Sequence, residues 1–130
     1  MQQNANMNDD TTTLNELKKT VAQFVDERDW NRFHAPKNVA MSICIEAAEL
    51  LEHFQWLNAD QCERDTLSAE KLHEIGEECA DVLAYLLSLA NRLDLDLSDI
   101  FEQKMKRNAE KYPIPFPGEP SCELQPAVAE

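Results

Sequence analysis

The chain has 130 residues, of which 43% are hydrophobic, and this length and apolar content suit one domain with a modest core. Its formal net charge of −13 argues against a protein that binds the nucleic-acid backbone, because such proteins present clustered positive surface to phosphates. Only two glycines occur and strand-like alternation is lacking, which favours an all-α protein with four main helices.

The lack of targeting signals and of paired cysteines argues against further classes of protein. Neither a signal peptide nor an apolar run of 18 or more residues is found in the sequence, so we expect a cytoplasmic protein that does not cross a membrane. The four cysteines lack paired C-x-x-C spacing, which disfavours a zinc site. Cys44 and Cys79 lie within apolar helical patterns and are expected to be small buried residues.

A helical domain is expected over residues 12–113. Residues 1–11 are polar and without periodicity, which predicts a disordered segment. Thr13 and Glu16 have the spacing of a capping box, so a helix should begin there. Apolar residues then recur at a spacing near 3.6, and this first helix should end between residues 29 and 32.

Residues 30–38 interrupt the helical pattern and predict a tight connection. Pro36 disfavours helical geometry in the residue before it and suits the first turn of a new helix. Trp30, Phe33 and His34 lie close together in this connection. They could form an apolar wall beside a functional site, although aromatic residues in such a place are also common core or staple residues.

The second helix is expected from about Pro36 to Trp56 and carries the first acidic pair. Glu46 and Glu49 are three residues apart, so they lie on nearly the same helix face. An ordinary pair of surface acids is the alternative reading. The residues around the pair are almost all apolar, so at least one glutamate should be substantially buried and should either neutralise or recruit a cation.

A polar connector over residues 57–67 precedes the third helix, which Ser68 can cap and which should end near residues 91–93. The apolar surface of this helix is too broad for an ordinary surface helix. We therefore expect it to be covered by a second subunit, so that oligomerisation completes the helical bundle.

The third helix repeats the acidic spacing in Glu78 and Asp81, with Tyr85 one turn later. Two such helices packed together would bring four carboxylates to one pocket. Their mutual repulsion, about 332/(εr) kcal/mol for each pair, would be severe without a cation. The sequence therefore predicts a site for a hard divalent metal ion.

The fourth helix should cover about residues 99–111 and end before Pro113. Basic and amide side chains recur on it at helical spacing and can share one face: Lys104, Arg107, Asn108 and Lys111. This face is a candidate phosphate contact, or else a solvated face that complements the helix dipole. Residues 114–130 contain four of the six prolines and predict a mobile tail.

Taken together, residues 24–113 resemble the MazG-like all-α nucleotide pyrophosphohydrolases, most closely their dCTP pyrophosphatase-like branch. An ordered series of acidic, aromatic and basic residues carries the resemblance: Glu27 to Trp30, Phe33, His34, Pro36, Asn38, Glu46, Glu49, Phe54 to Trp56, Glu77, Glu78, Asp81, Val82, Tyr85, Lys104, Met105, Asn108, Tyr112 and Pro113.

The resemblance implies hydrolysis of nucleoside triphosphates to the monophosphate and pyrophosphate, with dCTP-like or non-standard deoxynucleotides as substrates in a house-cleaning role. It implies Mg²⁺, or Mn²⁺ as a substitute, held by four ligands: Glu46, Glu49, Glu78 and Asp81. Magnesium prefers carboxylate and phosphate oxygens, which agrees with these residue types. Glu49 or Glu78 could accept the proton of the attacking water, and the sequence leaves that choice open.

The resemblance also implies the residues that contact the nucleotide and the assembly. Aromatic residues would bind the base: Trp30, His34, Trp56 and Tyr85. The fourth helix would supply the phosphate or sugar contacts: Lys104, Arg107, Asn108 and Lys111. A homodimer or a dimer of dimers is expected.

Two other readings of the acidic helices stay open. A carboxylate-bridged di-iron bundle needs Glu-x-x-His pairs. Here His53 follows Glu49 by four residues, and Asp81 stands where a histidine would be needed, so iron is disfavoured. The other reading is a non-catalytic helical interaction module whose acids are surface charge only.

Overall fold

The computed structural model of the chain describes residues 6–118, and its regular elements within that range are helical. The α-helices are α1 (Leu14–Glu27), α2 (Pro36–Glu52), α3 (Ala69–Leu93) and α4 (Leu97–Lys111). The expectation of an all-α protein with four main helices is confirmed. The chain divides into two compact units, Met1–Leu95 and Asp96–Glu130, and each is described by itself.

Helix α1 begins with the predicted capping box. The backbone N–H of Glu16 donates to the Thr13 hydroxyl over 3.2 Å, and the backbone N–H of Thr13 donates to the Glu16 carboxylate over 2.7 Å. The helix ends slightly earlier than expected, and Asp29 then adopts a left-handed φ of 53°. Of the segment expected to be disordered, residues 1–5 lie outside the described residues, and Thr12 N–H closes a turn onto the Asn8 carbonyl.

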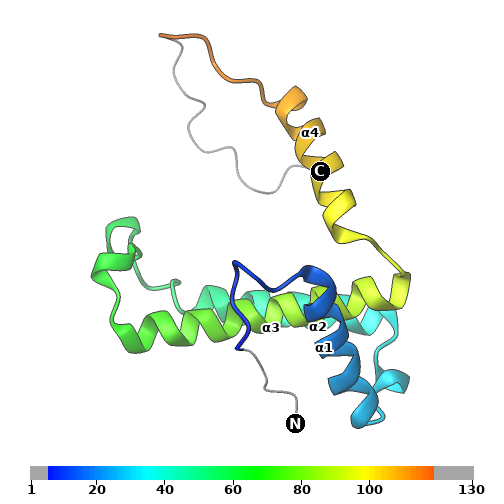
Figure 1. Cartoon of the computed structure of the whole chain (residues 1–130). Coiled ribbons are helices and arrows are strands. Elements are labelled where there is room, and N and C mark those ends of the chain that lie inside the picture. The colour runs from blue at the N-terminus through cyan, green and yellow to red at the C-terminus, as the bar shows by residue number, and fades with distance from the viewer. Residues whose placement is uncertain (1–5, 119–130) are drawn as a thin grey trace. The chain divides into compact units, whose positions relative to one another are not determined.

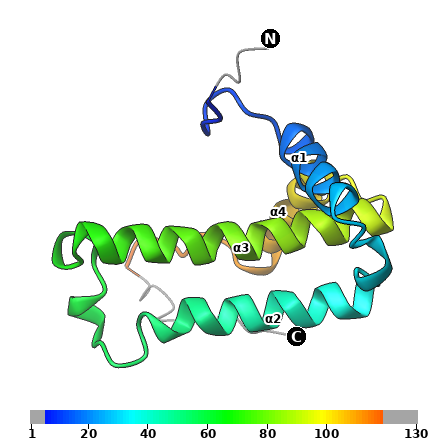
Figure 2. The same ribbon diagram turned by 90° about the horizontal axis from the view of Figure 1, so that it is seen from below.

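Helices α2 and α3 run side by side in opposite directions (Figures 1 and 2). Pro36 occupies the first turn of α2, as its fixed φ favours. The prediction that α2 continues to Trp56 was wrong, because the helix ends at Glu52. The N–H groups of His53 and Phe54 bond to carbonyls only three residues back, which tightens and closes the last turn.

Helix α3 is the longest helix in the described part of the chain and carries α2 and α1. The Ser68 hydroxyl accepts from the Lys71 N–H over 3.1 Å, which confirms the predicted cap. The connector before it contains two short 3₁₀ turns, η2 (Ala59–Gln61) and η3 (Arg64–Thr66). Helix α1 crosses the C-terminal part of α3 (Figure 2), where the Asn91 amide donates to the Lys18 carbonyl over 2.9 Å.

The core of a single chain is small. Among the described residues, the buried apolar side chains are Val25, Val39, Leu87 and Ala90. The expectation that Cys44 and Cys79 are buried was wrong for the isolated chain, since both are exposed. Helix α3 packs against one side of α2, and Cys44 on α2 stays open to solvent. None of the described helices has the length and apolarity that a membrane span requires.

The second unit contains α4. The Asp96 carboxylate accepts from the Asp99 N–H over 3.1 Å and caps the helix, which therefore begins two residues before the expected start. An ion pair of 2.8 Å joins Lys106 to Glu102 on its surface. Residues 114–118 form no helix, and the rest of the predicted tail lies outside the described residues.

Candidate functional site

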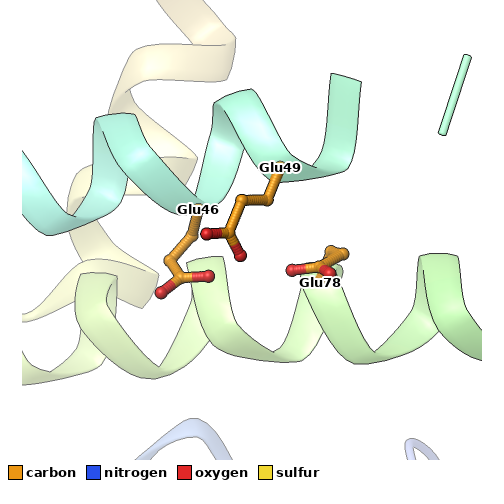
Figure 3. Close-up of side chains that lie close together, drawn as sticks. All are labelled: Glu46, Glu49 and Glu78. Carbon is orange, nitrogen blue, oxygen red and sulfur yellow. The ribbon is translucent and has the colours of Figure 1, made fainter. Parts of the chain in front are cut away.

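Three glutamates meet in the space between α2 and α3. Glu46 and Glu49 project from α2 toward Glu78 on α3 (Figure 3). One carboxylate oxygen from each lies within 4.8 Å of the others. The three-residue spacing places the first two acids on successive turns of one face, and the antiparallel packing brings the third opposite them. We call these three residues the carboxylate cluster.

Mutual repulsion and burial perturb the cluster. Desolvation raises the pKa of Glu46 above its ordinary value, and the charges of Glu49, Asp81 and Glu78 raise it further. Asp81 lies outside the three-residue cluster, although its charge acts on Glu46. Ionisation of Glu46 therefore lowers the stability of the folded protein. A bound cation would remove that cost.

The donor set fits a hard divalent cation. All three ligand atoms of the cluster are carboxylate oxygens, the type that Mg²⁺ and Mn²⁺ prefer. A di-iron site would need histidine nitrogen ligands as well. His53 lies near the cluster but is not part of it in the described chain, which disfavours the iron reading.

A cavity of about 610 Å³ opens beside the cluster. Glu49 and Glu78 line it together with His53, Trp56 and Lys71. The Trp56 side chain is 87% exposed, so its ring is available to stack against a ligand. The cluster thus borders a space that is large enough for the polar part of a small molecule.

A chain of polar contacts that the sequence did not reveal crosses this cavity wall. The Lys71 Nζ lies 2.8 Å from a Glu74 carboxylate oxygen and 3.2 Å from His53 Nδ1. The other ring nitrogen of His53, Nε2, lies 3.6 Å from Glu78 Oε1. The bond and the charge of Lys71 hold the pKa of Glu74 below its ordinary value. The signal in the sequence was the position of Lys71, two turns before Glu78 on the same face.

A second cavity, of about 140 Å³, lies where α1 crosses α3. It is lined by Trp30, His34, Asp81, Tyr85 and Ser88, among others. The rings of Trp30 and His34 stack with centroids 6.5 Å apart, and those of His34 and Tyr85 lie 6.4 Å apart. His34 Nδ1 is 3.1 Å from the Ser88 hydroxyl, a partner that sequence spacing alone did not single out.

The structure thus brings three of the four predicted base-binding residues together. Trp30, His34 and Tyr85 share the smaller cavity with Asp81, whereas Trp56 lines the larger one. The four residues predicted to bind phosphate or sugar all lie on α4, in the second unit: Lys104, Arg107, Asn108 and Lys111. Their assignment stays a prediction.

A sequence model described as the MazG-like family matches residues 41–119, which include both acidic pairs and α4. The chain belongs to the MazG-like family. This confirms the family resemblance predicted from the order of the acidic, aromatic and basic residues.

The sequence of this MazG-like chain is similar to the dCTP pyrophosphatases 1 of mammals. It is 35% identical over 102 residues to dCTP pyrophosphatase 1 of Mus musculus, a match that covers 78% of this chain and 60% of that protein. The human dCTP pyrophosphatase 1 is 37% identical over 101 residues, covering 78% of this chain and 59% of that protein. This chain therefore spans about 60% of the length of these relatives.

A solved structure supports the fold assignment. The crystal structure of a pyrophosphatase from Archaeoglobus fulgidus matches with a TM-score of 0.72 and 38% sequence identity. The match covers 84% of this chain and the whole of that one. The chain therefore shares the all-α MazG-like fold of that protein.

Proposed function

We propose that this protein hydrolyses nucleoside triphosphates to the monophosphate and pyrophosphate in the presence of Mg²⁺. The observation that carries the proposal is the carboxylate cluster, which shares Glu49 and Glu78 with the larger cavity, in a chain of the MazG-like family. The names of the relatives support a deoxycytidine-type substrate. We also propose, from the family alone, a house-cleaning role that removes non-standard nucleotides from the cytoplasmic pool.

The metal would be held by Glu46, Glu49 and Glu78, with Asp81 as a fourth ligand. Support comes from the all-oxygen donor set and from the raised pKa of Glu46. Mn²⁺ has the same preference for carboxylate oxygens and would substitute. When bound, such ions polarise a phosphoryl oxygen and neutralise the charge of the triphosphate.

The chain itself supplies the proton acceptor. Glu49 and Glu78 both line the larger cavity as well as the cluster, so either can face an attacking water. A carboxylate within hydrogen-bond reach of that water can take its proton as the new P–O bond forms. We propose one of these two residues as the general base.

Base recognition is proposed for the smaller cavity. Trp30, His34 and Tyr85 offer aromatic faces, and the bonded pair of His34 and Ser88 offers polar atoms that can read a base edge. Trp56 lines the larger cavity instead, so its exposed ring would contact the substrate outside the base pocket. Stacking tolerates every base, so selectivity would depend on the polar atoms.

A second copy of the chain would cover the exposed apolar surface. Met41, Ile45 and Leu51 are 49%, 57% and 63% exposed along α2, and Leu83 and Leu86 are 40% and 42% exposed on α3. Met41 and Ile45 are four residues apart on one face of α2, and Leu83 and Leu86 are three residues apart on one face of α3, whereas Leu51 lies on another side of α2. We propose a homodimer or a dimer of dimers, tested by light scattering of the wild type and of Ile45→Glu. A wild-type monomer would contradict the proposal.

The activity is tested by mixing the purified protein with single dNTPs and Mg²⁺ and resolving the products. Release of pyrophosphate and the monophosphate is expected, with dCTP among the best substrates. Release of orthophosphate would indicate another phosphohydrolase, and no turnover of any nucleotide would favour the non-catalytic interaction module.

Two substitutions separate the site from the fold. Glu49→Gln and Asp81→Asn should each abolish metal-dependent turnover while leaving the helical circular dichroism unchanged. Glu110→Gln, an exposed glutamate on α4, is the matched control and should stay active. Unchanged activity in both site variants would contradict the four-carboxylate assignment.

A further inference from the structure

The larger cavity contains a basic residue that is built into its wall. Lys71 lies at the start of α3 and lines the cavity with Glu49, Glu78 and Trp56. Its side chain is 39% exposed, so the ammonium group is partly withdrawn from solvent yet open to the cavity. This position places a positive charge beside a cluster of negative ones.

The contacts of Lys71 orient its ammonium group and the ring of His53. An ammonium group can only donate, so His53 Nδ1 must accept from Lys71. A neutral imidazole with an accepting Nδ1 carries its hydrogen on Nε2, and this atom faces Glu78 Oε1. Glu74 and His53 use two of the three donor hydrogens of Lys71 in the described chain, which leaves one for a ligand.

The order of residues along α3 gives the site a direction. Lys71, Glu74, Glu78, Asp81, Tyr85 and Ser88 follow one another at alternating steps of three and four residues, so they share one helix face. The aromatic cavity lies at the Tyr85 and Ser88 end, and Lys71 lies at the other end. Glu78 of the cluster lies between them along the helix.

We propose that Lys71 binds the outer phosphates of the substrate, those that leave as pyrophosphate, with Glu74 positioning its ammonium group. This inference rests on the proposed hydrolysis of nucleoside triphosphates. A base in the aromatic cavity directs the triphosphate across the cluster toward Lys71. The lysine then pairs with the phosphates beyond the bond that breaks, where negative charge accumulates on the leaving group.

The test compares Lys71→Ala, Lys71→Arg and the wild type in dCTP hydrolysis with Mg²⁺. Lys71→Ala should raise KM for dCTP about tenfold, because the contact between the ammonium group and the phosphates is lost. Inhibition by inorganic pyrophosphate should weaken about tenfold in Lys71→Ala, whereas inhibition by dCMP should not change. Lys71→Arg keeps the charge and should recover part of the effect. Lys19→Ala removes an exposed lysine of α1 and should behave as the wild type.

The positioning role of Glu74 has its own readout. Glu74→Gln should weaken pyrophosphate inhibition in the same direction but less, and it should add nothing when Lys71 is already alanine. An additive effect in the double variant would overturn the positioning role.

Calorimetric titration with inorganic pyrophosphate and Mg²⁺ separates this inference from the proposed activity. If Lys71→Ala binds pyrophosphate as tightly as an active wild type, the lysine contact is wrong while the activity stands. If the wild type turns over no nucleotide, the proposed function fails. Equal losses for pyrophosphate and dCMP would also overturn the inference, because a general distortion of the site would then explain both.

Discussion

Replacing Glu46 by glutamine should raise the stability of the metal-free protein and reduce the stabilisation that the protein gains from a bound metal ion. The carboxylate oxygens of Glu46, Glu49 and Glu78 lie within 4.8 Å of one another. Two unit charges at about that distance repel by about 1 kcal/mol in water and by about 3.5 kcal/mol at an effective dielectric constant of 20. Glu46 is half-buried, so we expect the free energy of unfolding without a cation to rise by about 1 to 3 kcal/mol.

The pH dependence provides an independent signature of the same repulsion. The folded-state pKa of Glu46 is raised above the 4.5 of an ordinary glutamate. The contribution of the protonated form is therefore complete below 4.5 and is lost as the pH rises through the raised folded value. The metal-free wild type should lose stability across that window, and Glu46→Gln should lack this loss.

Thermal unfolding with and without Mg²⁺, after treatment with a chelator, measures both effects. A ligand at one hundred times its dissociation constant adds about 2.7 kcal/mol to the wild type, and Glu46→Gln should gain clearly less. Glu110→Gln serves as the control, since its side chain lies outside the cluster. A metal-free variant that is less stable than the wild type, or one with the full gain from Mg²⁺, would refute the reasoning.

Three further substitutions test the core, the cap and the aromatic surfaces. Leu87→Ala removes a side chain that is only 2% exposed and should lower the free energy of unfolding by about 2 to 5 kcal/mol in denaturant titrations. Thr13→Ala removes the capping box of α1 and should cost about 1 kcal/mol in the same assay, whereas an equal loss from the exposed Thr20→Ala would point to a different cause. Trp56→Ala should raise KM for all dNTPs alike with little change in Tm, and a change in base preference would instead make Trp56 the residue that reads the base.

The sequence predicted the elements that depend on local chemistry. The capping box of Thr13 and the Ser68 cap were both visible in the residue order, because a cap needs only a side chain and the next turn of backbone. The C-terminus of α2 was misplaced, since Phe54 and Trp56 continue an apolar pattern that the backbone does not follow. Periodicity reports the apolar character of a stretch and not its backbone conformation, and Trp56 is in fact 87% exposed.

The parts of the site that the sequence did not reveal depend on packing between helices. His53 contacts Glu78 across the space between α2 and α3, and its partner Lys71 approaches it from the first turn of α3. No spacing rule within one helix predicts such a contact. The same reason explains the exposed Cys44, because the pattern shows that a face is apolar but not which molecule covers it.

One face of α3 links the carboxylate cluster to both cavities. The single face of α3 that carries Glu78 also carries Lys71 two turns before it and Tyr85 two turns after it. Its six polar and aromatic positions span about 25 Å at a rise of about 1.5 Å per residue. The cluster contributes negative charge only, so it would repel a phosphate ligand unless a bound metal ion or a cation of the cavity wall offsets that charge. Lys71 is the lysine that the described structure places on that wall. The two acidic pairs alone would therefore account for a metal site, and the proposed nucleotide substrate would lie along the face between the lysine at one end and the aromatic rings at the other.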